Sequence, residues 1–229
     1  MSAIERDFDR LALLDEGGWT HNNHYHKFLL QHLPKDCANA LEVGCGTGTF
    51  SRRLAERAVQ VIAVDLSSEM IRVARARSAH LRNVEYRCAD VMSCDLPPEH
   101  FDCVATIATL HHLPLRDVIL KLKEAVSPGG VLLVLDLFEP ERSLLKFGGW
   151  RDGLLNLTAM GISGGLRLVK NGRLKPPRAV RAAWEEHGKT DSYPSLEDIR
   201  IFCAEVLPGA EIKRHLLWRY SIVWQRPVK

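Results

Sequence analysis

The chain has 229 residues, of which 46% are hydrophobic and 26% charged, with a formal net charge of +3. That balance predicts a globular domain with a sizeable core, and the charge is too small to indicate a nucleic-acid partner. No signal peptide or bilayer-spanning apolar run is visible, and the six cysteines form no C-x-x-C pair. We therefore expect a cytoplasmic protein with reduced thiols and no integral membrane association.

The first 39 residues contain a cluster of aromatic and histidine side chains, Trp19–Phe28, that leads into a short apolar helix closed by Pro34. Histidines 21, 24 and 26 suggest a metal site, but no thiol or carboxylate lies at ligand spacing, so no metal is predicted. The position of the cluster before the first strand favours a lid over a cofactor. A plain surface helix is the alternative.

Residues 40–56 have the pattern of a strand, a glycine loop and a helix. A short apolar run is followed by Gly44, Gly46 and Gly48. Glycines let the backbone approach a ligand closely, and the N–H groups at the start of the next helix favour negative charge. A dinucleotide loop needs G-x-G-x-x-G, and Thr49 stands where its third glycine would be. This departure counts against an NAD-type enzyme.

From residue 40 onward, strand and helix patterns alternate, which is typical of a parallel sheet covered on both faces. After the first strand, the sequence predicts strands over 59–64, 84–88, 101–107 and 131–137, with helices over 67–76 and 115–126. Near the C-terminus, Ser195 and Asp198 form a capping box that opens a helix over 195–206. Strands over 211–216 and 220–225 then form a closing hairpin.

The glycine loop, with Glu42 two residues before its first glycine, resembles motif I of class I S-adenosylmethionine (SAM) methyltransferases. The similarity continues at fixed distances, with Asp65 after the second strand, Asp90 after the third, and the segments 101–104 and 128–130. The series is far more specific than any one member. It covers roughly residues 20–137 and the last 35.

This resemblance implies an α/β fold with a Rossmann-like seven-stranded methyltransferase sheet, an antiparallel last strand and an inserted helical cap. It implies a single domain over residues 1–229. The parts would be N-terminal lid helices (1–39), a SAM-binding core (40–137), a cap insertion (138–194), and a closing helix and hairpin (195–229).

The cofactor would be SAM. Asp65 ends the second strand, where a carboxylate can accept hydrogen bonds from both ribose hydroxyls; an N-cap on the following helix is the alternative. By resemblance, Asp90 would accept a hydrogen bond from the adenine amino group and Met70 would pack on the adenine, although Met70 could also fill the core. The full set of cofactor-binding residues implied is Tyr25, Glu42, Gly44, Gly46, Gly48, Asp65, Leu66, Met70, Asp90, Val91 and Ile107.

The segment after the fourth strand lines the reaction centre of such folds, because ligands bind beyond the carboxyl ends of the strands. Its Leu-His-His-Leu sequence, residues 110–113, resembles that of small-molecule methyltransferases, which include quinone-pathway enzymes. We expect His112 to face the pocket and the other histidine to be a hydrogen-bonded structural residue. His187 is a second candidate base, with a solvated helix end as the alternative.

Residues 138–194 form an insertion too long for a plain loop. Its apolar residues are spaced as an amphipathic helix interrupted by glycines, and its second half is basic. The apolar residues are Leu144, Leu145, Phe147, Trp150, Leu154, Leu155, Leu157, Met160 and Ile162. We expect this stripe to pack onto the sheet and roof a substrate pocket; contact with a membrane surface is the alternative.

The sequence therefore predicts methyl transfer from SAM to a small-molecule acceptor, and it leaves O-, N- and C-methylation open. A catalytic base, His112 or His187, is needed only if the acceptor must lose a proton. Two other functions stay possible at this point: a SAM-binding module without catalysis, and an NAD-type oxidoreductase. The oligomeric state is open.

Overall fold

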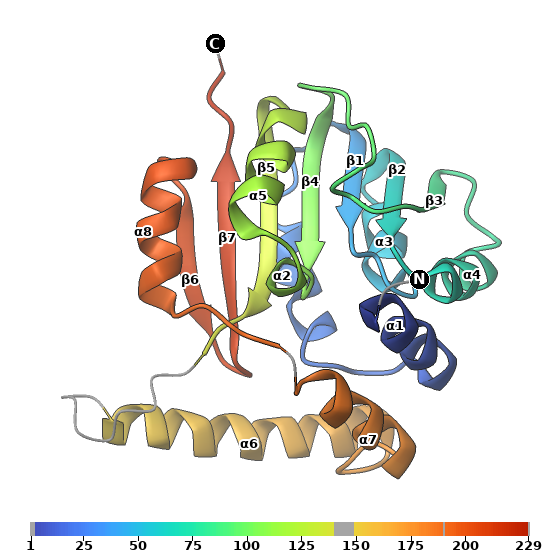
Figure 1. Cartoon of the computed structure of the whole chain (residues 1–229), viewed down its shortest axis with the longest axis vertical. Helices are drawn as coiled ribbons and strands as arrows, with labels where there is room; N and C mark the ends of the chain where they lie inside the picture. Colours follow the sequence, from blue (N-terminus) through green and yellow to red (C-terminus); the bar gives the residue numbers. More distant parts are fainter. Residues whose placement is uncertain (1–2, 140–148, 190, 229) are drawn as a thin grey trace.

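The computed structural model describes residues 3–139, 149–189 and 191–228 (Figure 1). Seven strands form one sheet in the order β3-β2-β1-β4-β5-β7-β6. The strands are β1 (Cys37–Val43), β2 (Ala58–Asp65), β3 (Val84–Cys88), β4 (Phe101–Ile107), β5 (Val126–Leu137), β6 (Glu211–His215) and β7 (Arg219–Gln225). This confirms the expected α/β fold class and its seven-stranded sheet.

The direction of the last strand also agrees with the prediction. β1 to β5 are parallel to their neighbours, whereas β7 is antiparallel to both β5 and β6. The reversal comes from the tight turn between β6 and β7, in which Leu217 and Trp218 have φ of 59° and 57°. Left-handed turn residues of this kind match the twist of a hairpin.

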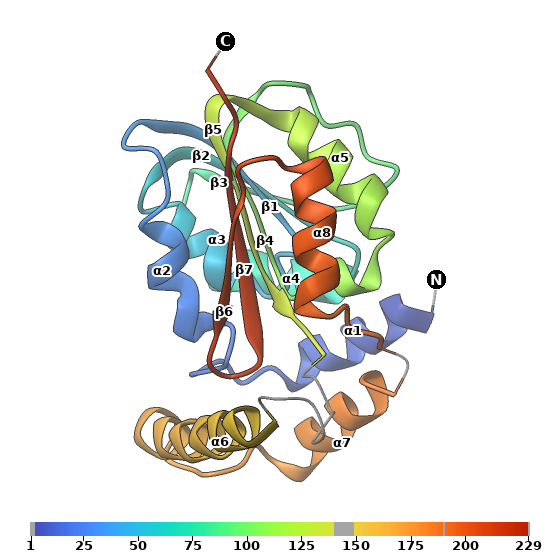
Figure 2. The same ribbon diagram turned by 90° about the vertical axis from the view of Figure 1, so that its left-hand side faces the viewer.

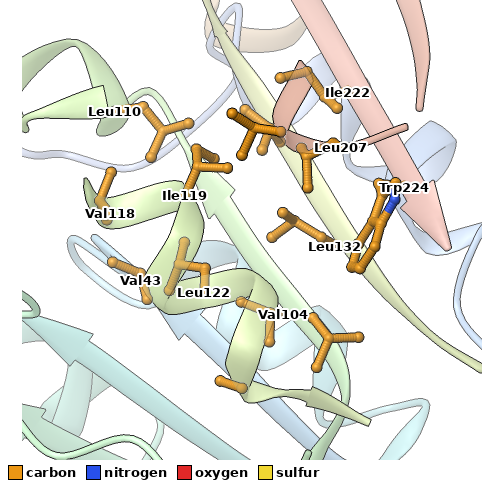
Figure 3. Close-up of a cluster of buried hydrophobic side chains, with 14 of the residues drawn as sticks. Val43, Val104, Leu110, Val118, Ile119, Leu122, Leu132, Leu207, Ile222 and Trp224 are labelled. Atoms are coloured by element: carbon orange, nitrogen blue, oxygen red, sulfur yellow. The ribbon is translucent and has the colours of Figure 1, made fainter. Parts of the chain in front are cut away.

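Helices cover both faces of the sheet (Figure 2). α2 (His26–Leu30), α3 (Thr49–Leu54) and α4 (Ser68–Arg77) pack on one face, and α5 (Leu115–Ala125) and α8 (Leu196–Val206) on the other. The core under α5 and α8 joins Val104 of β4 and Leu132 of β5 to Ile119 and Leu122 of α5 (Figure 3). These strands are apolar on both sides because both sides are covered.

Local signals define the helix starts as the sequence predicts. Ser195 and Asp198 form a capping box at the start of α8, in which the Ser195 hydroxyl accepts from the Asp198 N–H at 3.1 Å. The start of β5 differs from the prediction. Residues 127–130, expected as a turn, belong to β5, where the register with β4 shifts between Phe101 and Cys103.

The N-terminal segment also differs in detail. It begins with α1 (Ala3–Leu14), and the predicted apolar helix before Pro34 is reduced to the 3-10 turn η1 (Asn23–Tyr25) and the five residues of α2. A second 3-10 turn, η2 (Leu110–His112), follows β4. η2 carries the two adjacent histidines singled out in the sequence.

The insertion forms α6 (Gly149–Asn171) and α7 (Arg178–His187), and it corrects two expectations. The glycines do not interrupt α6, since each costs only about 1 kcal/mol in a long helix. The apolar stripe does not pack onto the sheet: Leu154, Leu157 and Met160 are 58%, 67% and 62% exposed. Residues 144, 145, 147 and 150 of the predicted stripe fall outside the described side chains.

The side of α6 that packs against the molecule is instead small and polar. Ala159 is 3% exposed and Ser163 is 8% exposed. The Ser163 hydroxyl lies 2.7 Å from Nε2 of His21, and the Trp218 indole donates to Asn156 at 3.1 Å. Among the helices described, none is long and apolar enough to cross a membrane.

Candidate active site

The glycine loop lies at the carboxyl end of β1. Gly44, Gly46 and Gly48 have φ of +72°, +52° and +75°, which side-chain-bearing residues rarely adopt. A Cβ on Gly44 would lie 2.0 Å from Oγ1 of Thr109, so packing against the segment after β4 requires this glycine. A Cβ on Gly46 would meet nothing closer than Sδ of Met70 at 4.0 Å. Because Gly46 has no side chain, there is space between this part of the loop and Met70.

Asp65 connects the glycine loop to α4. Its carboxylate accepts the Gly46 N–H at 2.7 Å and the Ser67 N–H at 2.9 Å. Burial raises the pKa of Asp65, against the opposing effect of these two N–H groups. The N-cap role belongs to Ser67, whose Oγ accepts the Met70 N–H at 3.1 Å. Each carboxylate oxygen of Asp65 has a further lone pair that a ligand hydroxyl can use.

Glu42 lies beneath the loop and is 2% exposed. It accepts a hydrogen bond from the Ser51 hydroxyl of α3, and burial raises the pKa of Glu42 to about 8. The carboxyl group is therefore protonated for the most part at neutral pH. In this position Glu42 holds α3 against the strand that carries the loop.

The other predicted cofactor residues follow β2, β3 and β4. Asp90 is exposed, and its Oδ1 accepts the Met92 N–H at 2.8 Å. Val91 is buried in the core beneath α5, so its side chain contributes to packing there. Leu66 and Ile107 are half-buried at the carboxyl ends of β2 and β4.

The element that covers this end of the sheet is α1, which packs against both α4 and α7 (Figure 1). Asp9 accepts from the Ser67 hydroxyl at 2.5 Å and the Glu69 N–H at 3.2 Å. Asp15, one residue beyond α1, accepts from Oγ1 of Thr47 in the glycine loop and from Arg77, each at 2.6 Å. No motif in the sequence marked Asp9 and Asp15 as part of the site, in the way that the glycine spacing marked the loop.

The Trp19–Phe28 cluster, predicted as the lid, contacts α3, α6 and the β6–β7 hairpin. The ring of His26 lies 4.8 Å from that of Phe50, two residues after Gly48. The Trp19 N–H donates to Oδ1 of Asn171 on α6 at 2.8 Å, and the Tyr25 hydroxyl donates to the Leu216 carbonyl at 2.5 Å. The predicted cofactor residue Tyr25 therefore contacts the β6–β7 hairpin through its hydroxyl, and its side chain packs in the same buried cluster as Phe50. The cluster attaches α6 and the hairpin to the domain, because its aromatic and amide groups pair with both.

Beyond β4, the structure brings the two predicted catalytic histidines together. The rings of His112 and His187 have centroids 5.0 Å apart, and the Phe8 ring of α1 contacts them at 5.3 and 4.9 Å. His187 is 3% exposed, so it is not a solvated helix end. Its burial follows from the packing of α7 against α1.

His111 is the hydrogen-bonded histidine that the sequence anticipated. Its Nδ1 lies 2.7 Å from Oδ1 of Asp136, a buried carboxylate at the end of β5. Because an ionised carboxylate only accepts, Nδ1 of His111 carries a proton in this hydrogen bond. Asp136 also accepts the Leu110 N–H at 2.8 Å, which fixes η2 against β5.

Asp191 lies at the centre of the three imidazoles. Its carboxylate is 3.6 Å from Nδ1 of His112 and 4.0 Å from Nε2 of both His111 and His187. These separations exceed a normal N–O hydrogen bond, whereas Oδ2 accepts from the Tyr193 hydroxyl at 2.9 Å. We call His111, His112, His187 and Asp191 the imidazole cluster.

The electrostatics of the cluster keep His112 uncharged. Burial, followed by the neighbouring His111, lowers the pKa of His112 to about 4, although Asp191 acts in the opposite direction. The sequence predicted no metal. Of the residues described, one group has the spacing of metal ligands: the donor atoms of His111, His112 and Asp191 lie within 4.8 Å of one another.

The residues at the carboxyl ends of β1 and β2 fit SAM. The left-handed loop is open at Gly46 toward Met70, and the Asp65 carboxylate stands beside it with acceptor capacity for ribose hydroxyls. Thr109 lies against Gly44 and precedes the imidazole cluster by only two residues. The cofactor end and the reaction end of the site are therefore adjacent.

The sequence of the chain is similar to known methyltransferases. Residues 40–130 match a family described as a methyltransferase domain. An uncharacterized methyltransferase of Mycobacterium tuberculosis is 33% identical over 214 residues, which are 92% of this chain and 98% of that protein. A ubiquinone biosynthesis O-methyltransferase of Idiomarina loihiensis is 35% identical over 108 residues, which are 46% of this chain and 44% of that protein.

Solved structures show the same fold at low identity. The N-methyltransferase NodS from Bradyrhizobium japonicum, in complex with S-adenosyl-L-homocysteine, has a TM-score of 0.64 at 15% identity, covering 99% of this chain and 100% of that one. Phosphoethanolamine N-methyltransferase 2 of Haemonchus contortus, in complex with SAM, has a TM-score of 0.68 at 14% identity, covering 99% of this chain and 60% of that one.

These similarities agree with the glycine loop, the position of Asp65 and the strand order. They do not favour an NAD-type oxidoreductase or a binding module without catalysis. The chain belongs to the class I SAM-dependent methyltransferases, enzymes that use S-adenosylmethionine as methyl donor.

Proposed function

We propose that this enzyme methylates a small molecule and that the acceptor binds at the imidazole cluster. The observation that carries the proposal is the convergence of His112 and His187, from segments far apart in the chain, beside the Gly44–Thr109 contact. The Leu-His-His-Leu segment and the partial similarity to a ubiquinone O-methyltransferase support a small acceptor with an ionisable group. Bound SAM would supply a methyl group already activated by its sulfonium.

The proposed catalytic residues are His112 and His187, one of which takes the acceptor's proton. A pKa of about 4 keeps His112 unprotonated at neutral pH, so its lone pair is free, but the same shift makes it a weak base in the free enzyme. The charge that develops on an imidazole is then stabilised by Asp191, 3.6 Å from His112 and 4.0 Å from His187. His111 is proposed as a positioning residue, since Asp136 fixes its ring.

The test begins with a labelled-methyl screen of small molecules to identify an acceptor. On that acceptor, His112→Gln or His187→Gln should lower kcat by about 10²–10⁴-fold, the usual loss for general-base catalysis. SAM affinity, measured by calorimetry, should not change, because the proposal assigns both rings to the acceptor. His80→Gln, at an exposed position outside the site, is the matched control.

Turnover within a few-fold of wild type in both variants would refute the base. The enzyme would then act by positioning alone, which can itself supply a large effective molarity. A second experiment tests whether His111, His112 and Asp191, whose donor atoms have the spacing of metal ligands, bind an ion. The base proposal predicts full activity after treatment with a metal chelator. Loss of activity that added metal restores would assign the cluster to an ion instead.

A cytoplasmic location is also proposed. The structure contains free thiols at Cys37, Cys45, Cys88, Cys94, Cys103 and Cys203. Burial raises the pKa of Cys37 and Cys203 to about 11, so these thiols act as small apolar side chains. A reducing compartment suits such a set.

A further inference from the structure

The outermost layer of the molecule is α6, which crosses the end of the domain opposite the C-terminus (Figures 1 and 2). Its outer face is the side with Leu154, Leu157 and Leu168, which are 58%, 67% and 50% exposed. Met160 and Val169, 62% and 79% exposed, lie at the two edges of that face. The side that faces the molecule carries Ala159 and Ser163. A surface helix normally turns its apolar side inward, so the orientation of α6 is reversed.

The outer face of α6 has the character of an interaction surface. Contiguous exposed apolar surface on a folded protein marks an interaction site, whereas scattered apolar residues do not. Leu154, Leu157 and Leu168 lie on one stripe of the helix, because spacings of three, four and seven residues return to the same side. Gly161 lies on that stripe too, and a Cβ added there would meet no atom within 4 Å.

The charge around the outer face is one-sided. From residue 153 to residue 184 the chain has six cations, Arg167, Lys170, Arg173, Lys175, Arg178 and Arg181, and no acid. The rest of the chain has 31 − 6 = 25 cations and 28 acids, which is a net charge of −3. The positive charge of the protein therefore resides in this segment.

Three of these cations are exposed and available to a partner. Lys170, Lys175 and Arg178 are exposed at the end of α6, in the following loop and at the start of α7. Two others have partners within the protein: Arg173 pairs with Glu16, and Arg167 lies 5.7 Å from the centroid of the Trp19 ring. Lys170 is seven residues after Ser163 and so lies on that side of α6, whereas Lys175 and Arg178 follow the helix.

We propose that the outer face of α6 binds the surface of an anionic lipid bilayer, with Lys175 and Arg178, which follow the helix, at the headgroups. An apolar helix face next to basic side chains is the arrangement of interfacial helices, which lie in the plane of the membrane. A second copy of the chain is a poorer occupant. It would bring the same acid-free, cationic segment against itself, whereas anionic lipid supplies the opposite charge.

Co-sedimentation with vesicles tests the proposal, and it does not depend on which acceptor is methylated. The protein should sediment with phosphatidylcholine vesicles that contain about one third phosphatidylglycerol, and only weakly with pure phosphatidylcholine. Raising the salt to about 0.5 M should weaken binding. Neutralising Lys175 and Arg178 together as glutamine should reduce affinity by about 25-fold, at about fivefold for each cation.

Matched variants separate the face from general surface effects. Leu157→Glu should abolish sedimentation, whereas Ile201→Glu on α8, where Ile201 is 63% exposed, should not change it. Lys35→Gln with Arg82→Gln, both exposed and located just before β1 and β3, is the control for charge. Unchanged SAM affinity in every variant shows that the domain is folded.

Three results would overturn the proposal. One is the absence of sedimentation with anionic vesicles. Another is equal binding by wild type, Leu157→Glu and the glutamine variant. The third is a stable dimer, seen by light scattering, that Leu157→Glu converts to monomer while vesicle binding is lacking; a second copy would then cover α6.

Discussion

At the scale of single residues, Asp65 has two functions in one carboxylate. It accepts two backbone N–H groups that shape the loop and α4, and it offers further acceptor capacity to a ligand. A sequence motif records only the second of these. Substitutions at this position should therefore affect both the loop and the cofactor.

We expect Asp65→Ala to weaken SAM binding by about 1.5–3 kcal/mol, which is a tenfold to hundredfold loss of affinity. The reason is the loss of a charged acceptor for the ribose hydroxyls. Asp65→Asn keeps one acceptor oxygen for the N–H groups and separates the two functions. Calorimetry that finds the same SAM affinity in Asp65→Ala and wild type would remove the ribose assignment.

The glycines can be distinguished in the same way. Gly48 and Gly209 both have positive φ, at +75° and +83°, but a Cβ on Gly48 would lie 2.5 Å from the Tyr86 hydroxyl, whereas one on Gly209 has nothing within 4 Å. Each alanine variant should lose about 1–2 kcal/mol from backbone strain. Gly48→Ala should lose more, because Tyr86 is buried and cannot move aside.

Chemical denaturation of the two variants measures this difference. Equal losses of unfolding free energy would mean that Tyr86 rearranges without cost.

At the scale of elements, α1 covers the start of α4, beside the glycine loop where we propose that SAM binds. Its contacts are polar ones to Ser67, Glu69 and Thr47, together with apolar packing of Leu11 and Ala12 against Met70. Helices attached by a few contacts at their surface open more readily than the core. α1 is thus suited to admit and release SAM.

We expect Asp15→Ala to loosen the end of α1 and to speed the dissociation of SAM several-fold. Asp15 would lose its bonds with Thr47 and Arg77, which are each 2.6 Å long. Hydrogen exchange should increase in residues 3–14, and stopped-flow release of the cofactor should accelerate. Arg10→Ala is the control, because its partner Asp7 lies on the same helix. Unchanged exchange in Asp15→Ala would show that α1 is held by its apolar side alone.

At the scale of the whole molecule, buried neutral histidines set the response to acid. Burial is the main cause that lowers the pKa of His21, His26, His112 and His215 to about 4. Between pH 6.5 and 4 the unfolded chain therefore binds more protons than the folded one, and stability falls as the pH falls. Burial raises the pKa of Glu42 to about 8, so its contribution to stability decreases as the pH rises from about 4.5 to 8.

We expect stability to be greatest near pH 6.5. His26, which is 5% exposed, should contribute about 2 kcal/mol to the loss between pH 7 and pH 5. Urea unfolding of His26→Gln at both pH values should show that much less dependence on pH, and His80→Gln should behave as wild type. An equal pH dependence in His26→Gln and wild type would contradict this assignment.

Much of the fold was determined by local sequence. The strands from β1 to β4, the capping box of α8 and the closing hairpin agree with the prediction, because apolar runs, glycine turns and capping side chains act over a few residues. The glycine loop and Asp65 were identified for the same reason, since their spacing is itself a local signal.

Tertiary structure alone decided how distant segments meet. No spacing indicates that His187 and Asp191 of the insertion join His111 and His112, or that Asp15, just after α1, bonds to Thr47 of the glycine loop. The sequence did not determine the orientation of α6 either. The helical period shows that Ala159 and Ser163 lie opposite the leucines, but it does not show which of the two sides packs inward. Contacts with Trp19, His21 and Trp218 selected the small side, and so left the leucines at the surface.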